Sequence, residues 1–318
     1  MPDDRWIFSS WAFSFIKEAK KISEATGIPV VIGKYSPLSY KGSGLVIGNP
    51  DDITMRIIRT TQFVKFKCYL VIEGIVTNGL MIRFFQNFEN YCPSEFVKEC
   101  LEQVDIPVAE VIPHAIKEVH NRRITKREKA KLLYIAWWHN FLPRKYPKEC
   151  IEALKMIKYP FELVILTSPD NRYKSELKKY GKVIDKIGKL TEEELLNLYL
   201  NADYYVSFST SEGFGVPILE ALSCGLPVIH VNAKPFVEIT NEKCSIRFDY
   251  DKVKEHPCPN FKGLLHIYKA ESLAEAINNA LEIYYNDFEK YKEMCEEAYK
   301  RARDFTYENT YVKFKEII

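Results

Sequence analysis

The chain has 318 residues, of which 47% are hydrophobic and 28% charged, and its formal net charge is +2. This is the composition of a soluble globular protein long enough for two domains, and the near-neutral charge gives no drive toward nucleic acid. The eight cysteines form no C-x2-C pair, no run of about 18 apolar residues occurs, and no secretory signal opens the chain, so we expect a cytoplasmic protein with reduced thiols and no zinc site.

The first half of the chain alternates between β-rich runs and amphipathic segments. Its apolar spacing predicts, in order, strand 6–11, helix 12–25, strands 28–33 and 45–48, helix 51–60, strand 66–72, helix 78–86, strand 88–92, a helix capped by Ser94, and strand 108–112. Strands that alternate with helices in this way indicate a parallel sheet.

A polar segment separates the two halves. Residues 120–131 read HNRRITKREKAK and carry six lysines and arginines. We interpret 119–130 as an interdomain linker, and a basic patch for an anionic membrane surface or acceptor is the alternative. The alternation then resumes with strand 131–137, helix 147–157, strand 162–167, helix 172–180, strand 182–186 and a helix that begins with a capping box at 191–194.

Residues 204–231 are the most informative stretch, YYVSFSTSEGFGVPILEALSCGLPVIHV. An apolar strand leads into a glycine-bearing loop, and Pro217 lies where a first helical turn accepts proline. Gly225 suits the C-terminal end of the helix, and residues 228–231 form a second strand. We expect parallel strands joined by a right-handed connection.

Two glutamates stand eight residues apart in this unit, Glu212 in the loop and Glu220 in the helix. Glycines between them let the backbone approach a ligand, and amides at a helix N-terminus favour an anion. The glycines are Gly213 and Gly215, and the amides are those of Phe214, Gly215 and Val216. Since a carboxylate accepts hydrogen bonds from neighbouring sugar hydroxyls, one glutamate on each side of an anion site fits a nucleotide diphosphate sugar.

The string E-G-F-G-V-P-x-x-E-A-x-x-x-G-x-P-V-I resembles the E-x7-E signature of retaining glycosyltransferase family 4, a group with the GT-B fold. Residues 93–97, PSEFV, and 112–116, IPHAI, are similar to further segments of that family, although Ala115 stands at its usual glycine and Lys117 at its usual aspartate. The resemblance implies an α/β protein with two Rossmann-like domains, whose parallel sheets face each other across a cleft.

The same resemblance implies the domain organisation. We expect an acceptor-side domain at 1–118, the linker at 119–130, a nucleotide-sugar-binding domain at 131–303 and a tail at 304–318 that crosses back to the first domain. It also implies transfer without a metal or any cofactor besides the donor. The D-x-D at 249–251 lies in a charged loop far from the two glutamates in sequence, and we interpret it as a turn.

The expected phosphate-binding residues follow strand 131–137. Departure of a nucleotide diphosphate needs positive charge on the leaving oxygens, and similar enzymes clamp the diphosphate here with an arginine and a lysine. Lys145 matches the lysine, Arg144 is an adjacent cation, and His139 stands where the first arginine is expected. His139 would supply charge only when protonated. The resemblance places the nucleobase near the backbone of Ile187.

The resemblance also assigns the glutamates: Glu212 faces the transferred sugar and Glu220 faces the ribose. In the first domain, Glu73 and His114 each end a predicted strand, where α/β sites form, and are candidates for catalytic groups. For each of these two, a cap or a surface polar group is the alternative.

These features predict a retaining glycosyltransferase that moves a hexose from a nucleotide diphosphate sugar to a hydroxyl of a glycan, lipid or protein acceptor. Two other interpretations stay open. A GT-B hydrolase or phosphorylase-like enzyme would use the same donor site. A non-catalytic nucleotide-sugar-binding protein is the third, because His139 replaces the expected arginine.

Overall fold

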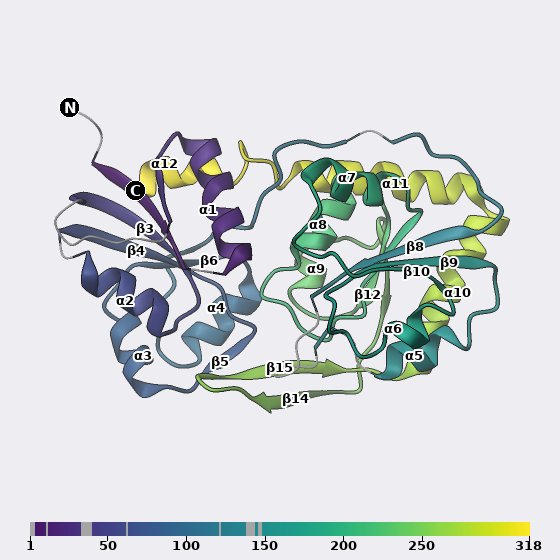
Figure 1. Ribbon diagram of the computed structural model, residues 1–318, viewed down its shortest axis with the longest axis horizontal. Coiled ribbons are helices and arrows are strands. Elements are labelled where there is room, and N and C mark those ends of the chain that lie inside the picture. Colours follow the sequence, from purple (N-terminus) through teal and green to yellow (C-terminus); the bar gives the residue numbers. More distant parts are fainter. Residues whose placement is uncertain are drawn as a thin grey trace. The chain divides into compact units, whose positions relative to one another are not determined.

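In the computed structural model the chain forms two compact units. The structure describes residues 4–10, 12–32, 40–61, 63–120, 122–137, 144–145 and 148–318. Unit 1 comprises Met1–Lys117, Pro257–Gly263 and Phe305–Ile318. Unit 2 comprises Glu118–His256 and Leu264–Asp304. Each unit contains a six-stranded parallel sheet with helices packed against it (Figure 1), so the predicted α/β class is confirmed.

The sheet of unit 1 has the strand order β2-β1-β3-β4-β6-β7. Its strands are β1 (Arg5–Ser9), β2 (Val30–Val31), β3 (Gly42–Gly48), β4 (Val64–Leu70), β6 (Asn90–Cys92) and β7 (Glu110–Val111). The helices between them are α1 (Phe13–Thr26), α2 (Asp52–Thr60), α3 (Gly79–Phe85) and α4 (Glu95–Glu102). The run Leu45-Val46-Ile47 in β3 is fully buried, as expected for a parallel strand covered on both faces.

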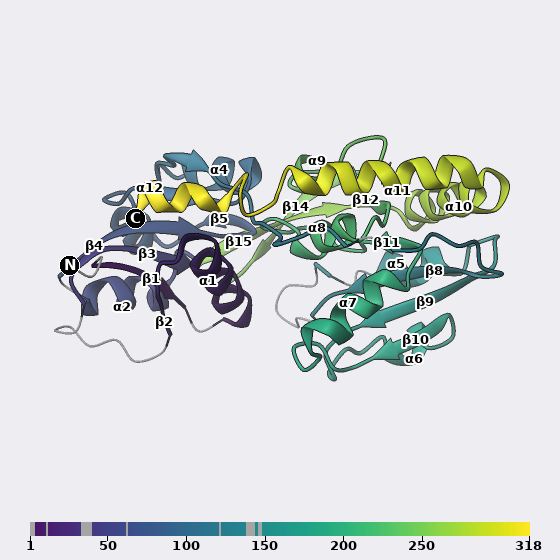
Figure 2. The ribbon, with the colours of Figure 1, turned by 90° about the horizontal axis from the view of Figure 1, so that it is seen from above.

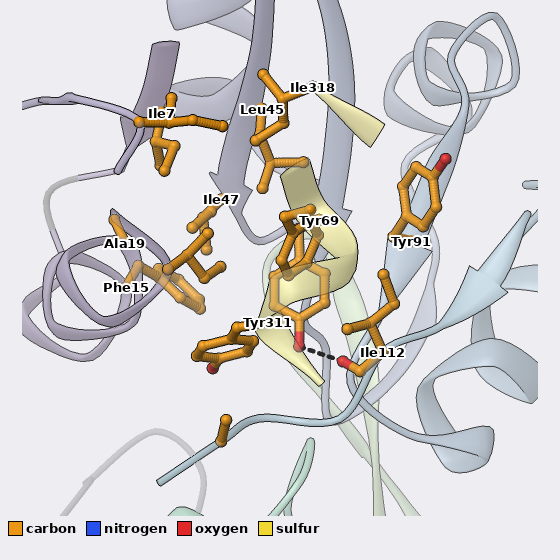
Figure 3. Packing of buried hydrophobic residues seen from close by; sticks show 14 of the residues in the cluster. Ile7, Phe15, Ala19, Leu45, Ile47, Tyr69, Tyr91, Ile112, Tyr311 and Ile318 are labelled. Carbon is orange, nitrogen blue, oxygen red and sulfur yellow. Dashed lines mark hydrogen bonds between the residues drawn. The ribbon is translucent and has the colours of Figure 1, made fainter. Parts of the chain in front are cut away.

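The end of the chain completes the core of unit 1. After an isolated bridge between Ile116 and Thr306, it forms a short 3-10 helix (Tyr311–Lys313) and α12 (Phe314–Ile317). Figure 3 shows Tyr311 and Ile318 among apolar side chains of α1 and β3. In the same cluster the hydroxyl of Tyr69 donates to the carbonyl of Ile112 at 2.6 Å. The core of unit 1 therefore joins residues from both ends of the sequence.

The sheet of unit 2 has the order β10-β9-β8-β11-β12-β13. Its strands are β8 (Ala130–Ile135), β9 (Phe161–Leu166), β10 (Gly181–Ile184), β11 (Tyr204–Val206), β12 (Val228–Val231) and β13 (Ser245–Phe248). Counted along the chain, this is the 3-2-1-4-5-6 order of a Rossmann fold. The helices are α5 (Lys148–Leu154), α6 (Lys174–Leu177), α7 (Glu192–Leu200), α8 (Val216–Ser223), α9 (Phe236–Ile239), α10 (Ala270–Asn286) and α11 (Phe288–Arg303). Figure 2 shows the long α10 and α11 running beside each other.

Side-chain caps fix several of these helix starts. Thr191 and Glu194 form the predicted capping box of α7, and the hydroxyl of Ser94 accepts from the amide of Val97 at the start of α4. The S-x-x-E pattern at 272–275 does not open a helix, because α10 already begins at Ala270 and has no side-chain cap. The buried apolar face of α10, which includes Leu273, Ile277 and Leu281, stabilises the helix without a cap.

A third, smaller sheet was not predicted from the sequence. It has the order β14-β15-β5, from β14 (Lys252–Pro257), β15 (Phe261–Ile267) and β5 (Gly74–Val76). β15 and β5 are antiparallel, with Lys262 opposite Ile75. A Cβ on Gly74 would lie 1.8 Å from the carbonyl oxygen of Lys262, so only glycine allows this approach.

The segment expected to be a linker, 119–130, belongs to unit 2 in the structure. The guanidinium of Arg122 donates to the carbonyl oxygens of Ala202 at 3.0 Å and Gly225 at 3.1 Å. Arg127 forms an ion pair of 3.1 Å with Asp203. Arg122 and Arg127 thus tie the segment to unit 2, whereas Arg123, Lys126 and Lys129 are exposed. Among the described residues, no helix is long and apolar enough to span a bilayer.

Candidate functional site

The candidate residues of unit 2 come together where the strand order of its sheet reverses. From β8 the chain passes to β9 on one side, and β11 later pairs with β8 on the other. The loops after β8 and β11 therefore leave neighbouring carboxyl ends in opposite directions, which is where open α/β sheets bind ligands. The first loop carries Arg144 and Lys145, and the second carries Glu212.

Glu212 pairs with both cations. Nη1 of Arg144 lies 3.1 Å from Oε2 of Glu212, and Nζ of Lys145 contacts the other carboxylate oxygen, Oε1. The three side chains are only 9%, 10% and 12% exposed, in the order Arg144, Lys145 and Glu212. Because little water reaches them, their mutual attraction is much stronger than that of a surface ion pair.

The charges of this cluster follow from the same contacts. Burial raises the pKa of Glu212, but the charges of Lys145 and Arg144, with hydrogen bonds from Lys145 and Ser209, outweigh it and leave the pKa below its ordinary value. Glu212 is therefore ionised at neutral pH and acts as a hydrogen-bond acceptor. Two cations and one carboxylate leave the cluster with one net positive charge.

Hydrogen bonds to the backbone carbonyls of Arg144 and Lys145 hold the two loops together. The hydroxyl of Tyr134, on β8, donates to the carbonyl of Lys145 at 2.6 Å and lies 3.0 Å from Oγ of Ser209. The amide of Thr210 donates to the carbonyl of Arg144 at 2.7 Å. Tyr134 is 1% exposed, so it fixes the cation-bearing loop from inside the unit.

His266, on β15, supports the other loop, which follows β11 and carries Glu212. Its amide and its Nδ1 both lie close to the carbonyl oxygen of Thr210, at 2.9 Å and 3.0 Å. Because a carbonyl only accepts, Nδ1 carries the proton. Neither Tyr134 nor His266 was predicted from the sequence, since only the observed strand order brings them beside the loop.

The second glutamate lies on α8. Gly215 precedes this helix with φ 109° and ψ 46°, and a Cβ there would lie 3.3 Å from Cδ1 of Ile239. Pro217 occupies the first turn, as predicted. The hydroxyl of Tyr199 donates to Oε2 of Glu220 at 2.8 Å, and Tyr199 is 2% exposed. The carboxylate of Glu220 is thus held by a buried side chain of α7.

The remaining residues of the predicted loop lie between these two glutamates. Gly213 and Phe214 are buried, and Val216 is half-buried at the first position of α8. The first backbone amides of an α-helix have no acceptor within the helix, so they are available to an anion.

The loop expected to contact a nucleobase follows β10. The amide of Ile187 donates to the carbonyl of Thr167 at 3.2 Å. Gly188 has φ 75°, and a Cβ on it would lie 3.1 Å from Cζ3 of Trp137. Trp137 follows β8 closely and is 43% exposed. The structure therefore adds the exposed indole of Trp137 beside the Ile187 loop. This indole was not predicted from the sequence.

Three further residues were predicted from the sequence: His139, Glu73 and His114. His139 lies outside the described residues. Glu73 and His114 belong to unit 1, and Glu73 is half-buried between β4 and β5.

His114 is a core residue of unit 1, only 4% exposed. Its Nδ1 lies 3.2 Å from the hydroxyl of Tyr69, 3.1 Å from that of Tyr311 and 3.5 Å from Oε2 of Glu18. Burial lowers its pKa to about 4, with Glu18 opposing and Lys21 adding to the shift. The ring is therefore enclosed in the core of unit 1 and neutral at pH 7, so His114 is not the surface polar group that was the alternative for it.

Comparisons with known proteins agree with this fold. The sequence profile of the family described as "Glycosyl transferases group 1" matches residues 117–301, more than half of the chain. "Uncharacterized glycosyltransferase 335" of Sulfolobus islandicus rod-shaped virus 1 is 26% identical over 243 residues, which cover 76% of this chain and 65% of that protein. "O-antigen chain mannosyltransferase B" of Escherichia coli is 43% identical over 56 residues, 18% of this chain and 15% of that protein. The chain thus matches less than two thirds of the length of either relative.

Solved structures show the same architecture. Sucrose-phosphate synthase from Thermosynechococcus elongatus superposes with a TM-score of 0.71 at 12% identity, covering 98% of each chain. Anabaena Alr3699/HepE, in complex with UDP and glucose, gives 0.66 at 13% identity, again over 98% of each chain. At such low identity these likenesses establish the fold, which is GT-B, as predicted. With the profile match over residues 117–301, the chain belongs to the glycosyl transferases group 1 family.

Proposed function

We propose that this protein is a metal-independent, retaining glycosyltransferase that moves a hexose from a nucleotide diphosphate sugar to an acceptor hydroxyl. The observation that carries the proposal is the buried cluster of Arg144, Lys145 and Glu212 at the carboxyl ends of β8 and β11. This cluster combines cations for a diphosphate with a carboxylate for sugar hydroxyls.

The two cations stabilise the leaving group of the donor, the nucleoside diphosphate. When the bond between the sugar and the diphosphate breaks, negative charge develops on the departing oxygen, and Arg144 and Lys145 stabilise it. The amides at the start of α8 add further partial positive charge. Because these groups supply the charge that a divalent cation would otherwise provide, we propose transfer without a metal.

The nucleoside is held by three features of unit 2. Glu220, fixed by the hydroxyl of Tyr199, accepts hydrogen bonds from the ribose hydroxyls. The exposed ring of Trp137 offers a surface for stacking, next to the Ile187 loop. We therefore place the base on the exposed surface of the Trp137 ring, beside that loop.

The transferred sugar faces Glu212. Its hydroxyls donate to the carboxylate, which orients the ring for attack at the anomeric carbon. The resemblance of the Glu212 to Glu220 string to retaining family 4 supports retention of configuration. Glu73 of unit 1 is proposed as a contact on the acceptor side, where the acceptor is a glycan, lipid or protein hydroxyl.

The proposal is tested by ligand binding and product analysis. Thermal unfolding is measured with uridine, guanosine and adenosine diphosphates and their glucose and mannose conjugates, because a ligand that binds the folded state raises its melting temperature. Conjugates that bind are then incubated with acceptor mixtures, with and without EDTA, and NMR assigns the anomeric configuration of the product. A retained configuration and EDTA resistance are expected. Free sugar alone would indicate a hydrolase, and binding without turnover a non-catalytic protein.

A substitution links that activity to the site. Lys145→Met should lower the transfer rate about a hundredfold or more, because a preorganised charge at the leaving group is lost. Lys155→Met is the matched control. Lys155 is exposed, lies in the turn after α5, and forms an ion pair with Glu152 of that helix. If both variants transfer sugar at the wild-type rate, the proposed site is wrong.

A further inference from the structure

We propose that Glu212 makes the site select the intact donor over the spent nucleoside diphosphate, because its carboxylate and the diphosphate compete for the same two cations. The inference rests on the proposed function and deepens it. It assigns to Glu212 a role in specificity and product release, in addition to its contact with the transferred sugar.

Glu212 pairs with both cations at once. Each oxygen of the Glu212 carboxylate contacts a different cation, Oε2 that of Arg144 and Oε1 that of Lys145. All three side chains are about nine-tenths buried. The carboxylate thus contacts cations that a diphosphate would need, and an arriving phosphate has to displace it or share them.

Displacement has a large cost unless Glu212 gains new donors. A buried carboxylate that loses its partners is left as an uncompensated charge, which is strongly unfavourable. The site also keeps Glu212 charged, because its cations and Ser209 hold its pKa low. Protonation therefore does not neutralise Glu212 at neutral pH. The free-energy cost of separating it from its cations has to be offset by new hydrogen bonds to the carboxylate.

The intact donor supplies those hydrogen bonds. Hydroxyls of its sugar donate to Glu212, so the carboxylate exchanges two cations for two or more hydroxyl donors, and the cations turn to the diphosphate. A nucleoside diphosphate without the sugar brings the competing anion but none of these donors. The site therefore discriminates between two ligands that carry the same diphosphate and the same nucleoside.

The backbone allows this exchange to occur in side chains alone. Tyr134 holds the carbonyl of Lys145, and Thr210 holds the carbonyl of Arg144. With both main-chain positions fixed, only the long side chains need to turn. After transfer, the sugar hydroxyls leave with the acceptor, Glu212 returns to Arg144 and Lys145, and the diphosphate loses its cations. Sugar transfer thus triggers release of the product.

Two glutamine substitutions with opposite expected effects test the inference. Calorimetry measures the affinity of wild type, Glu212→Gln and Glu220→Gln for uridine, guanosine and adenosine diphosphates and for inorganic pyrophosphate. Glu212→Gln should bind the preferred diphosphate and pyrophosphate about tenfold more tightly than wild type, because the competing charge is removed. Glu220→Gln should bind the same diphosphate about tenfold less tightly and leave pyrophosphate unchanged.

A third variant guards against a folding defect. Glu212→Asp keeps the negative charge and should keep weak, wild-type-like binding of the diphosphate, and thermal unfolding reports whether each variant is folded. Diphosphate affinity that is equal or lower in a folded Glu212→Gln overturns the exchange while leaving the proposed function intact. If neither wild type nor a folded Glu212→Gln binds any of the four probes, the proposed donor site itself is wrong, and the inference falls with it.

Discussion

At the scale of single residues, buried hydroxyl groups hold two residues of the site in place, one by its main chain and one by its carboxylate. Tyr134 and Tyr199 are each at most 2% exposed, and each donates to a residue of the proposed donor site, Lys145 and Glu220 respectively. A phenol is well suited to this task, because its ring packs in the core while its hydroxyl reaches a polar partner.

Tyr199→Phe tests the positioning of Glu220. Removing the hydroxyl should weaken nucleoside diphosphate binding by roughly 0.5–1.5 kcal/mol, because the carboxylate loses one donor that orients it. Pyrophosphate binding, measured in the same calorimeter, should not change. Tyr204→Phe is the control, since its buried hydroxyl donates to the carbonyl of Ala280 at 2.9 Å. Equal losses in both variants would show a general packing effect.

A second prediction at this scale concerns acid stability. Burial lowers the pKa of His230 on β12 to about 4, although a hydrogen bond to Val231 opposes this. The unfolded chain then binds the proton at higher pH than the folded one, so the contribution of His230 is complete above about pH 6.5 and is lost as the pH falls toward 4. The free energy of unfolding from urea titrations should fall by about 3 kcal/mol from this group over that range.

The control for this pH dependence is His230→Gln. The variant cannot take up a proton at this position, so its free energy of unfolding should fall less steeply between pH 6.5 and 4 than that of wild type. Parallel curves for the two proteins would mean that His230 does not cause the acid sensitivity. His114 of unit 1, whose pKa is also lowered to about 4, accounts for part of the slope in both proteins.

At the scale of elements, the start of α8 depends on a glycine with a left-handed conformation. Gly215→Ala should destabilise the protein by roughly 1–3 kcal/mol, because φ 109° is strained for any residue with a Cβ. It should also weaken nucleoside diphosphate binding, since the amides of the first turn move. Gly79→Ala is the matched control: it starts α3, and nothing lies within 4 Å of its added Cβ.

Urea unfolding and calorimetry of both glycine variants check this prediction. Gly79→Ala should be neutral or stabilising by about 0.4–1 kcal/mol, as expected where the backbone suits alanine. If Gly215→Ala proves as harmless as Gly79→Ala, the geometry at the start of α8 is not required for the site.

The elements that the sequence predicts well are those with their own periodic or capping signal. Thr191 and Glu194 mark α7, and the apolar run after residue 203 marks β11, so both could be found from local residues. β5 and β15 were missed because β5 has only three residues and their pairing is antiparallel between distant segments. His114 could be placed near a strand end but not in the core, because its partners Glu18 and Tyr311 come from the two ends of the chain.

In the site, too, local features could be predicted from the sequence, and contacts between distant segments could not. The residues Lys145 and Glu212 could be named from a motif and its chemistry. Their direct ion pair could not, because it depends on β8 and β11 being neighbours in the sheet.

At the scale of the whole molecule, the two units have separate tasks in this proposal. The proposed contacts to the nucleotide come from unit 2, whereas the last residues of the chain complete the core of unit 1. Tyr311→Ala should therefore lower stability by roughly 3–5 kcal/mol, because a fully buried ring is lost. Nucleoside diphosphate affinity should stay at the wild-type value under conditions where the variant is folded.

Val312→Ala is the control for that substitution, since Val312 is the next residue and 37% exposed. It should change the free energy of unfolding by no more than about 0.5 kcal/mol. A loss of nucleotide affinity in a folded Tyr311→Ala would show that unit 1 contributes to the nucleotide site.

Hydrogen exchange with and without saturating nucleoside diphosphate tests the central claim most directly, because it locates the bound ligand along the chain. The diphosphate used is the one with the largest effect in thermal unfolding. We predict slower exchange in residues 207–216, including the first amides of α8, and around Arg144 and Lys145. Saturating binding that leaves these segments unchanged, or that protects only unit 1, would contradict a donor site at the carboxyl ends of β8 and β11.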